Sequence, residues 1–318
     1  MKNSASVFVA LLLSQLGVSA AQTVTQIPTE KPVTAVVKTP RGIYIETDAG
    51  TWRLEIGDCD GGICVKPDVI RGLPAPAPVG ALPDGKIATA REGNVRRAWF
   101  AEPTDRYQHC ILGDCIEAGS LVAELEDGSK LSLRLPIEQV FEDLTPRLFD
   151  IDGDGNSEII AIRASQTGGA AVVIYGVRGG EITEIASSTE NGQRNRWLNI
   201  AFIDVGTIAF VRTPHIGGRL ALLQYRPNGE VRESNDVVTN ISNHLIGSRE
   251  LDLQEPYQFE SLTAIAIPSQ SRNALRLIRR PNDIIDVPLP GKIDKAIVTV
   301  GNFLVTATED GTLLAIEP

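Results

Sequence analysis

The sequence predicts an all-β fold, namely a β-propeller of about six to seven four-stranded blades. Three observations predict it. Short runs of β-branched and aromatic residues alternate with turn dipeptides, similar segments recur along the chain, and residues 22–318 contain no twelve-residue stretch with helical periodicity. A closed ring of such sheets also leaves few exposed strand edges, which limits aggregation.

Turn dipeptides separate the expected strands. Glycine, asparagine and aspartate tolerate a positive φ, so Asp-Gly and Asn-Gly pairs suit tight hairpin turns. The sequence contains five such pairs between apolar runs, at Asp84-Gly85, Asp127-Gly128, Asn191-Gly192, Asn228-Gly229 and Asp310-Gly311. We expect each of them to connect two antiparallel strands.

Segments with one pattern recur along the chain. Aligning the segments that begin at Ile159 and Ile208 places Arg163 over Arg212, and a weaker copy begins at Thr263. A repeat of about 40 to 55 residues with four short strands is typical of propeller blades. The last segment offers only three strands, and residues 24–37 are expected to supply the fourth and close the ring. Two stacked β-sandwiches are the alternative architecture.

The first 21 residues have the features of a signal peptide. Lys2 precedes an apolar core at residues 5–13, and small residues precede Ala21. That core is too short to span a bilayer, although an uncleaved anchor is the alternative. We therefore expect residues 22–318 to be exported, periplasmic or secreted, as a single propeller domain without membrane insertion. The proline-rich stretch 72–85 is interpreted as an inter-blade loop, with a domain boundary as the alternative.

The charge of the chain excludes one large class of partners. The formal net charge is −10, and lysines and arginines form no run. Phosphate backbones are bound by clustered basic side chains, so we expect no nucleic-acid partner. The same acidity disfavours anionic membrane surfaces.

Four cysteines form two matching pairs in the sequence. Cys59 and Cys64 are separated by four residues, as are Cys110 and Cys115. An even count behind a signal peptide indicates disulfides, and of the three possible pairings we favour the local one. Each local bridge would stabilise the fold by about 2 kcal/mol. A zinc site made of all four thiolates is the alternative, but its usual spacing is C-x2-C and exported thiols are oxidised.

The stretch FDIDGDGNSEII, residues 149–160, concentrates acidic side chains. Asp150, Asp152 and Asp154 alternate, Gly155 allows the backbone to curl, and Glu158 follows. Hard oxygen ligands in a flexible loop suit Ca²⁺, so we expect one structural calcium site. An EF-hand would require an acid where Ala161 stands. The alternative is a solvated acidic turn that holds no ion.

This stretch resembles the Asp-x-Asp-Gly-Asp-Gly-x-x-Asp/Glu signature of FG-GAP/VCBS repeats, which build integrin-type β-propellers and many secreted bacterial proteins. The resemblance is specific over residues 149–225 and looser over 95–285. It implies a secreted bacterial member of unassigned activity. The next blade keeps only Asp204, so one loop is complete. The calcium ligands that the resemblance implies are Asp150, Asp152, Asp154, the main chain of Asn156, and Glu158.

Five further residues are candidates for a ligand-binding face: His109, Arg163, Arg212, His215 and His244. Converging histidines could form a metal site or an acid–base centre. Alternatively, each imidazole bonds the backbone of a neighbouring blade. The chain contains no G-x-S-x-G, H-E-x-x-H or P-loop motif, so no catalytic residue is assigned.

Three functions fit these patterns. The favoured one is an interaction module that binds a protein or glycan partner on one face of the ring. The second is an extracytoplasmic enzyme that acts on carbohydrate in an axial funnel lined by histidine and arginine. It requires the histidines, or Arg212 with a carboxylate, to lie within hydrogen-bonding reach. The third is a purely structural envelope protein.

Overall fold

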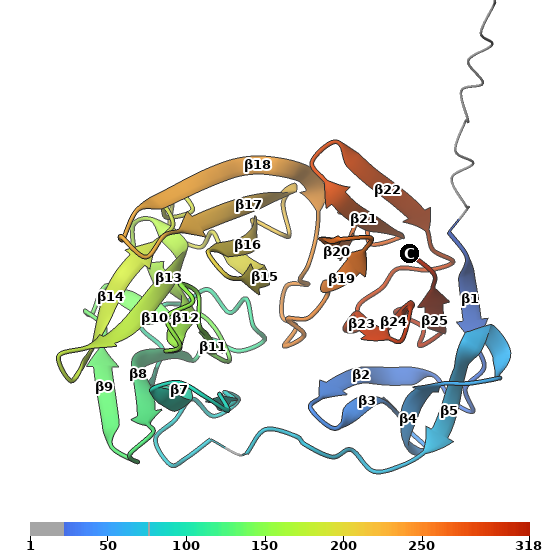
Figure 1. The fold of residues 1–318 in the computed structure, drawn as a ribbon, viewed down its shortest axis with the longest axis horizontal. Helices are drawn as coiled ribbons and strands as arrows, with labels where there is room; N and C mark the ends of the chain where they lie inside the picture. The colour runs from blue at the N-terminus through green and yellow to red at the C-terminus, as the bar shows by residue number, and fades with distance from the viewer. Residues whose placement is uncertain (1–21, 76) are drawn as a thin grey trace, which may run out of the picture.

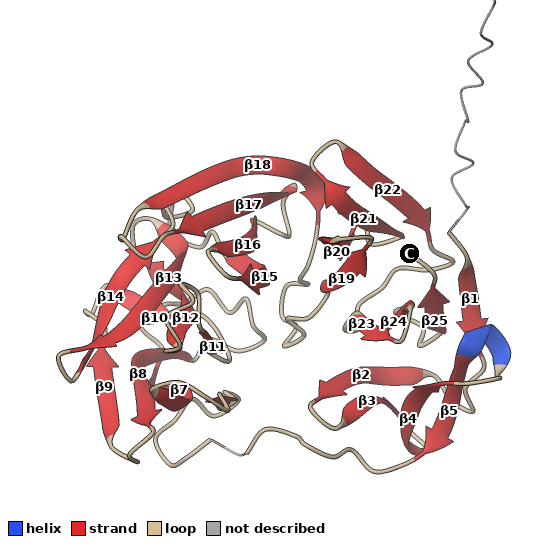
Figure 2. Cartoon of the chain, viewed as in Figure 1, coloured by secondary structure: helices blue, strands red, loops and turns tan. Residues whose placement is uncertain are grey.

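The computed structural model describes residues 22–75 and 77–318 and shows a ring of antiparallel sheets (Figure 1). Within these ranges the only helical element is a 3-10 turn, η1 (Asp60–Gly62), and the rest is strand and loop (Figure 2). The all-β prediction is therefore confirmed. Nothing helical here has the length and apolar character that a membrane crossing requires. The expected signal peptide, residues 1–21, lies outside the described residues.

The described residues form six blades, at the lower end of the expected range. Blades 2 and 3 share one nine-stranded sheet, joined where Phe141 pairs with Ala118. Blade 1 consists of β2 (Val33–Thr39), β3 (Gly42–Thr47), β4 (Gly50–Ile56) and β5 (Ile63–Pro67). Blade 2 consists of β6 (Ala88–Thr89), β7 (Val95–Thr104), β8 (Glu117–Leu125) and β9 (Lys130–Arg134). Blade 3 consists of β10 (Gln139–Phe141), β11 (Arg147–Phe149), β12 (Glu158–Ser165), β13 (Gly169–Arg178) and β14 (Glu181–Ser187).

The other three blades are regular four-stranded sheets. Blade 4 consists of β15 (Leu198–Asp204), β16 (Thr207–Arg212), β17 (Gly218–Tyr225) and β18 (Val231–Ile241). Blade 5 consists of β19 (Glu255–Phe259), β20 (Leu262–Pro268), β21 (Ala274–Arg280) and β22 (Asp283–Pro288). Blade 6 consists of β23 (Val298–Val300), β24 (Phe303–Ala307), β25 (Leu313–Ile316) and β1 (Val24–Ile27).

The two ends of the described chain meet in blade 6. Strand β1 pairs antiparallel with β25, from Val24 opposite Ile316 to Ile27 opposite Leu313. The first strand of the described chain thus completes the last blade, as expected from the missing fourth strand. Such a closure covers a sheet edge that would otherwise be exposed.

Three of the five turn dipeptides connect neighbouring strands, at Asp127-Gly128, Asn228-Gly229 and Asp310-Gly311. The prediction is wrong for the other two. Asn191-Gly192 lies in the crossover from β14 to β15, and Asp84-Gly85 lies in the segment before β6. A dipeptide that permits a positive φ suits any sharp bend, and long crossovers bend too.

Apolar side chains pack between the blades and hold the ring together. One buried cluster joins blades 2, 3 and 4 and includes Phe100, Phe141 and Phe210. Further clusters join blade 4 to 5, 5 to 6, and 6 to 1. Buried apolar area of this kind is the main source of stability.

The seam between blades 1 and 2 is different. No apolar cluster of the described residues joins these two blades. The free face of blade 1 instead carries ion pairs of Glu55 with Arg53 and Lys66. The proline-rich segment runs from β5 to β6 across this seam (Figure 1), and Leu82 N donates to the Phe100 carbonyl at 3.0 Å.

Candidate functional site

Chain topology brings the three histidines to one side of the ring. In a four-stranded blade, the connection between the second and third strands and the crossover to the next blade leave from the same end. His109 lies in the β7–β8 connection, His215 in the β16–β17 connection and His244 in the β18–β19 crossover. We call this side the histidine face.

His215 and His244 are hydrogen-bonded to each other. Nε2 of His215 lies 2.8 Å from Nδ1 of His244, and Nε2 of His244 lies 2.9 Å from the Ser248 carbonyl oxygen. A carbonyl only accepts, so neutral His244 carries its proton on Nε2 and accepts the His215 proton on Nδ1. Burial lowers the pKa of His215 to about 3 and that of His244 to about 4. Both imidazoles are therefore neutral at pH 7.

His109 forms a second pair with a buried carboxyl group. Its Nδ1 lies 2.5 Å from Oε1 of Glu142, whose other oxygen has no hydrogen-bond partner among the described residues. Glu142 is fully buried, and this burial raises its pKa well above the usual value. Burial, with Arg194 nearby, lowers the pKa of His109 to about 4. Neutral glutamic acid beside neutral imidazole is the stable state at pH 7, because burial disfavours both charges.

Trp197 connects the two pairs. Its indole Nε1 donates to the Glu142 carbonyl at 2.9 Å, and its ring stacks on His215 with centroids 6.1 Å apart. The centroid of the His244 ring lies 4.6 Å from that of Trp197. Two histidines thus pack on one buried tryptophan, and His109 is linked to it through Glu142. We call His109, Glu142, Trp197, His215 and His244 the histidine cluster.

Two buried carboxyl groups of this region escaped the sequence analysis. Glu142 was not proposed as a site residue, and neither was Glu117, whose pKa is raised to about 9 by burial and then by Glu142. The sequence signal was an acid inside an apolar run, as in QVFED at residues 139–143. A polar residue in a strand pattern that is otherwise buried is informative, because a buried carboxyl needs a partner.

The two candidate arginines lie apart from this cluster and make equivalent contacts in successive blades. Arg163 of β12 pairs with Glu184 of β14, and Arg212 of β16 pairs with Glu233 of β18. Each ion pair thus joins the second strand of a blade to its fourth strand. Arg212 reaches the cluster only indirectly, through Asn191, which donates to the Trp197 carbonyl at 2.8 Å.

The acidic loop lies at the opposite end of blade 3, between β11 and β12. Oδ1 of Asp150 accepts hydrogen bonds from the backbone of Gly153 at 2.8 Å and of Asp154 at 3.0 Å. Its Oδ2 accepts from Gly155 N at 2.9 Å. Both glycines have a positive φ, which lets the backbone wrap around the Asp150 carboxylate.

Three carboxylates of this loop converge. One oxygen from each of Asp150, Asp152 and Glu158 lies within 4.8 Å of the others. Burial, together with the neighbouring aspartates, raises the pKa of Glu158 to about 7. No described lysine or arginine forms an ion pair with these side chains or with Asp154. The uncompensated hard oxygens fit a divalent cation such as Ca²⁺.

The cysteines pair locally, as we favoured. Cys59 bonds Cys64 with Cα atoms 5.3 Å apart, and Cys110 bonds Cys115 with Cα atoms 4.2 Å apart. The second bridge closes the connection that carries His109. It therefore constrains the part of the histidine cluster that comes from blade 2.

Comparison with known proteins finds only distant structural similarity. No family model and no curated protein match the chain, so the FG-GAP/VCBS resemblance stays a hypothesis. Virginiamycin B lyase from Staphylococcus aureus is similar in structure at 14% identity, over 92% of this chain and 83% of that chain, with a TM-score of 0.37. BamB from Moraxella catarrhalis matches at 11%, over 93% and 100%, with a TM-score of 0.28. The Nup133 β-propeller domain from Vanderwaltozyma polyspora matches at 12%, over 90% and 70%, with a TM-score of 0.29.

Proposed function

We propose that this chain is an exported β-propeller that works as an interaction module and binds a protein partner on its histidine face. The observation that carries the proposal is a set of apolar side chains at the loop tips around the histidine cluster. Four isoleucines of this face are between 37% and 81% exposed. They are Ile116, Ile137, Ile216 and Ile246.

The chemistry of the face favours a protein over a glycan. Its exposed apolar side chains are aliphatic, whereas the aromatic rings of Tyr107 and Trp197 are buried. Protein interfaces bury aliphatic side chains, and glycan sites depend on accessible aromatic faces and polar groups. Arg194 lies exposed above the Tyr107 ring and would supply a polar contact at the rim.

The loops of this face are held in place before any partner binds. Gly247 N donates to the Ile111 carbonyl at 2.9 Å, which ties the β18–β19 crossover to the β7–β8 connection. Arg249 binds Asp84 and Asp114, each at 2.8 Å. Preorganised loops lose less conformational entropy on binding. We assign the histidine cluster the same supporting role beneath them.

A matched pair of variants tests the proposal. Ile216→Asp/Ile246→Asp places charge on the histidine face, and Ile56→Asp/Ile284→Asp does the same on the opposite side. Recovery of partners from the exported fraction of the host should be lost with the first variant and retained with the second. Equal recovery with both variants, or recovery of no partner by the wild type, would contradict the proposal.

A structural calcium ion at the acidic loop is part of this proposal. Asp150, Asp152 and Glu158 would hold it, and the resemblance to FG-GAP/VCBS repeats adds Asp154 and the Asn156 carbonyl. The ion would cancel the repulsion between these acids and fix the loop on blade 3. The two disulfides and the apolar N-terminal segment support export.

An enzyme acting on carbohydrate is the second candidate, because His109 and Glu142 form a hydrogen-bonded pair of the kind used in acid–base catalysis. The pair needs a substrate cavity beside it. Five of the cavities that open on the described surface, with volumes of about 120 to 660 Å³, have no histidine in their lining. Turnover of a polysaccharide that is lost in His109→Gln would favour the enzyme.

A further inference from the structure

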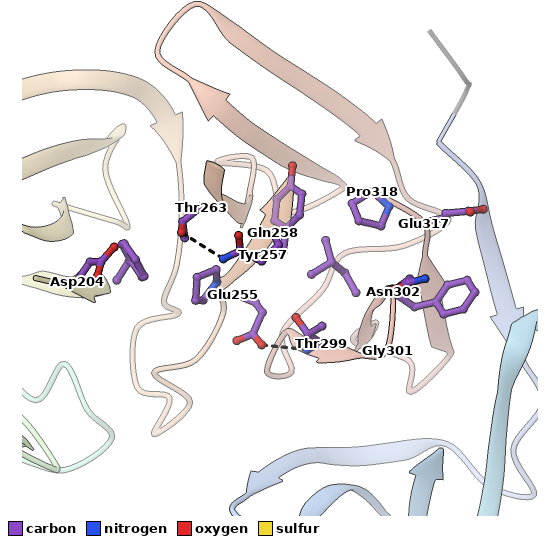
Figure 3. Close-up of a pocket in the computed structure, with 14 residues that line it drawn as sticks. Asp204, Glu255, Tyr257, Gln258, Thr263, Thr299, Gly301, Asn302, Glu317 and Pro318 are labelled. Carbon is purple, nitrogen blue, oxygen red and sulfur yellow. Dashed lines mark hydrogen bonds between the residues drawn. The ribbon is translucent and has the colours of Figure 1, made fainter. Parts of the chain in front are cut away.

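We propose that a groove on the side opposite the histidine face binds a ligand with primary ammonium groups on an alkyl chain. The groove has a volume of about 660 Å³ and lies where blades 4, 5 and 6 meet (Figure 3). The end of β15, strand β19 and the β23–β24 turn form its walls. Nothing in the proposed partner binding depends on this groove.

The groove is acidic. Asp204, Glu255 and Glu317 are among the 14 residues that line it, and the lining contains no lysine, arginine or histidine. Asp204 and Glu317 are exposed, and neither forms an ion pair with a described residue. They stand at opposite ends of the groove in Figure 3. An anionic ligand would be repelled here, and a cation with charges at both ends would be attracted.

Aromatic and aliphatic side chains cover the stretch between the carboxylates. Phe202, Tyr257 and Phe303 line the groove together with Pro256 and Leu304. Aromatic faces attract ammonium groups, and apolar walls favour a hydrocarbon chain over a bare metal ion. This combination selects an alkylammonium ligand over a simple inorganic cation.

The protein already shows how an ammonium binds at the inner end of the groove. Lys38 reaches across from β2 of blade 1, and its Nζ lies 2.6 and 2.9 Å from the two oxygens of Glu255. The Glu255 side chain is 7% exposed, whereas that of Lys38 is 55% exposed. Thr299 N also donates to Glu255 at 3.0 Å, and the Thr299 hydroxyl has no partner among the described residues. Asp204 and Glu317, which form no ion pair with a described residue, remain available to the ammonium groups of a ligand.

Two sources of this chemistry are distinguishable, namely a free polyamine and the lysine side chains of a peptide. Isothermal titration with spermidine forms one arm, and titration with a capped Lys-Gly-Lys peptide forms the other. Binding of spermidine alone identifies a small-molecule site, and binding of the peptide alone identifies a site for lysine side chains. Either result supports the proposal, as does binding of both.

Charge variants test whether the groove is the site that binds the amines. Asp204→Asn/Glu317→Gln should weaken binding about tenfold, since each exposed ion pair contributes about two- to fivefold. Glu181→Gln/Glu190→Gln removes the same charge from blade 3 and should leave the affinity unchanged. Lys38→Met should tighten binding, because Glu255 then accepts the ammonium of the ligand.

The proposal is overturned if neither amine binds the wild type, or if Asp204→Asn/Glu317→Gln binds as tightly as the wild type. It is also overturned if the control variant loses as much affinity as the groove variant, because the attraction is then nonspecific. The Ile216→Asp/Ile246→Asp variant should bind the amines normally, so this result is independent of the partner proposal.

Discussion

Blade 3 carries acidic side chains near both ends of its inner edge, and the two groups differ in how far they are buried. Glu142 follows β10 and is fully buried, whereas Asp150 and Asp152 follow β11 and are partly exposed. Burial keeps Glu142 protonated beside His109. The aspartates of the acidic loop lack a basic partner among the described residues.

This difference shows what decides the role of a carboxyl group in this protein. A carboxyl that is removed from water gives up its charge and becomes a hydrogen-bonding group of the core. A carboxyl that stays hydrated remains charged and is available to a cation. We therefore propose that the histidine cluster serves packing and that the acidic loop is a site that a metal ion completes.

Of the effects that distinguish the acidic loop from the buried Glu142, the effect of calcium on stability should be the largest. At a free concentration of 100 times its Kd, a ligand that binds only the folded state stabilises it by about 2.7 kcal/mol. Chelation should lower the melting temperature accordingly, and Asp152→Ala should abolish the response. Glu181→Gln, an acid outside the loop, should retain it. A melting temperature of the wild type that ignores calcium would contradict the site.

The two disulfides allow a matched test of the histidine cluster. Both bridges close loops of the same length, so chain entropy assigns each about 2 kcal/mol. Cys110→Ser/Cys115→Ser should cost more than Cys59→Ser/Cys64→Ser, because it also frees the connection that holds His109 against Glu142. Urea denaturation of the two variants measures the difference. Equal costs would mean that the bridge does not support the cluster.

Glu158 gives the smallest effect, about 1 kcal/mol after solvent screening, and its sign depends on pH. Its pKa is raised to about 7 in the folded state without calcium, from an ordinary value of 4.5. This group therefore contributes stability that is fully present below pH 4.5 and is lost as the pH rises through 7. Without calcium, the wild type should lose stability relative to Glu158→Gln over this range. With calcium, which favours the ionised form, the loss should disappear.

Local patterns predicted the strands and the repeat well. The alignment of Arg163 with Arg212 has a physical cause, because each arginine pairs with a glutamate on the fourth strand of its own blade. The seventh blade does not form among the described residues. Prolines cannot donate ladder hydrogen bonds, and the described residues of the stretch 72–85 form no named strand.

Contacts distant in sequence could not be predicted. His109 meets a cluster whose other histidines lie more than a hundred residues further along the chain, and only the arrangement of the blades in a ring brings them together. The Glu142 carbonyl accepts a hydrogen bond from Trp197, which belongs to the next crossover. Periodicity reports which side of a strand is buried, but it does not report which loops of different blades converge.

A pH titration of the three histidine side chains by NMR tests the central claim most directly, namely that loops of several blades pack into one dry cluster. Burial lowers the pKa of His109, His215 and His244 to about 4, 3 and 4. We expect no protonation of any of them between pH 8 and about 5 while the protein stays folded. Midpoints near 6.5, the value of a solvated imidazole, would contradict it.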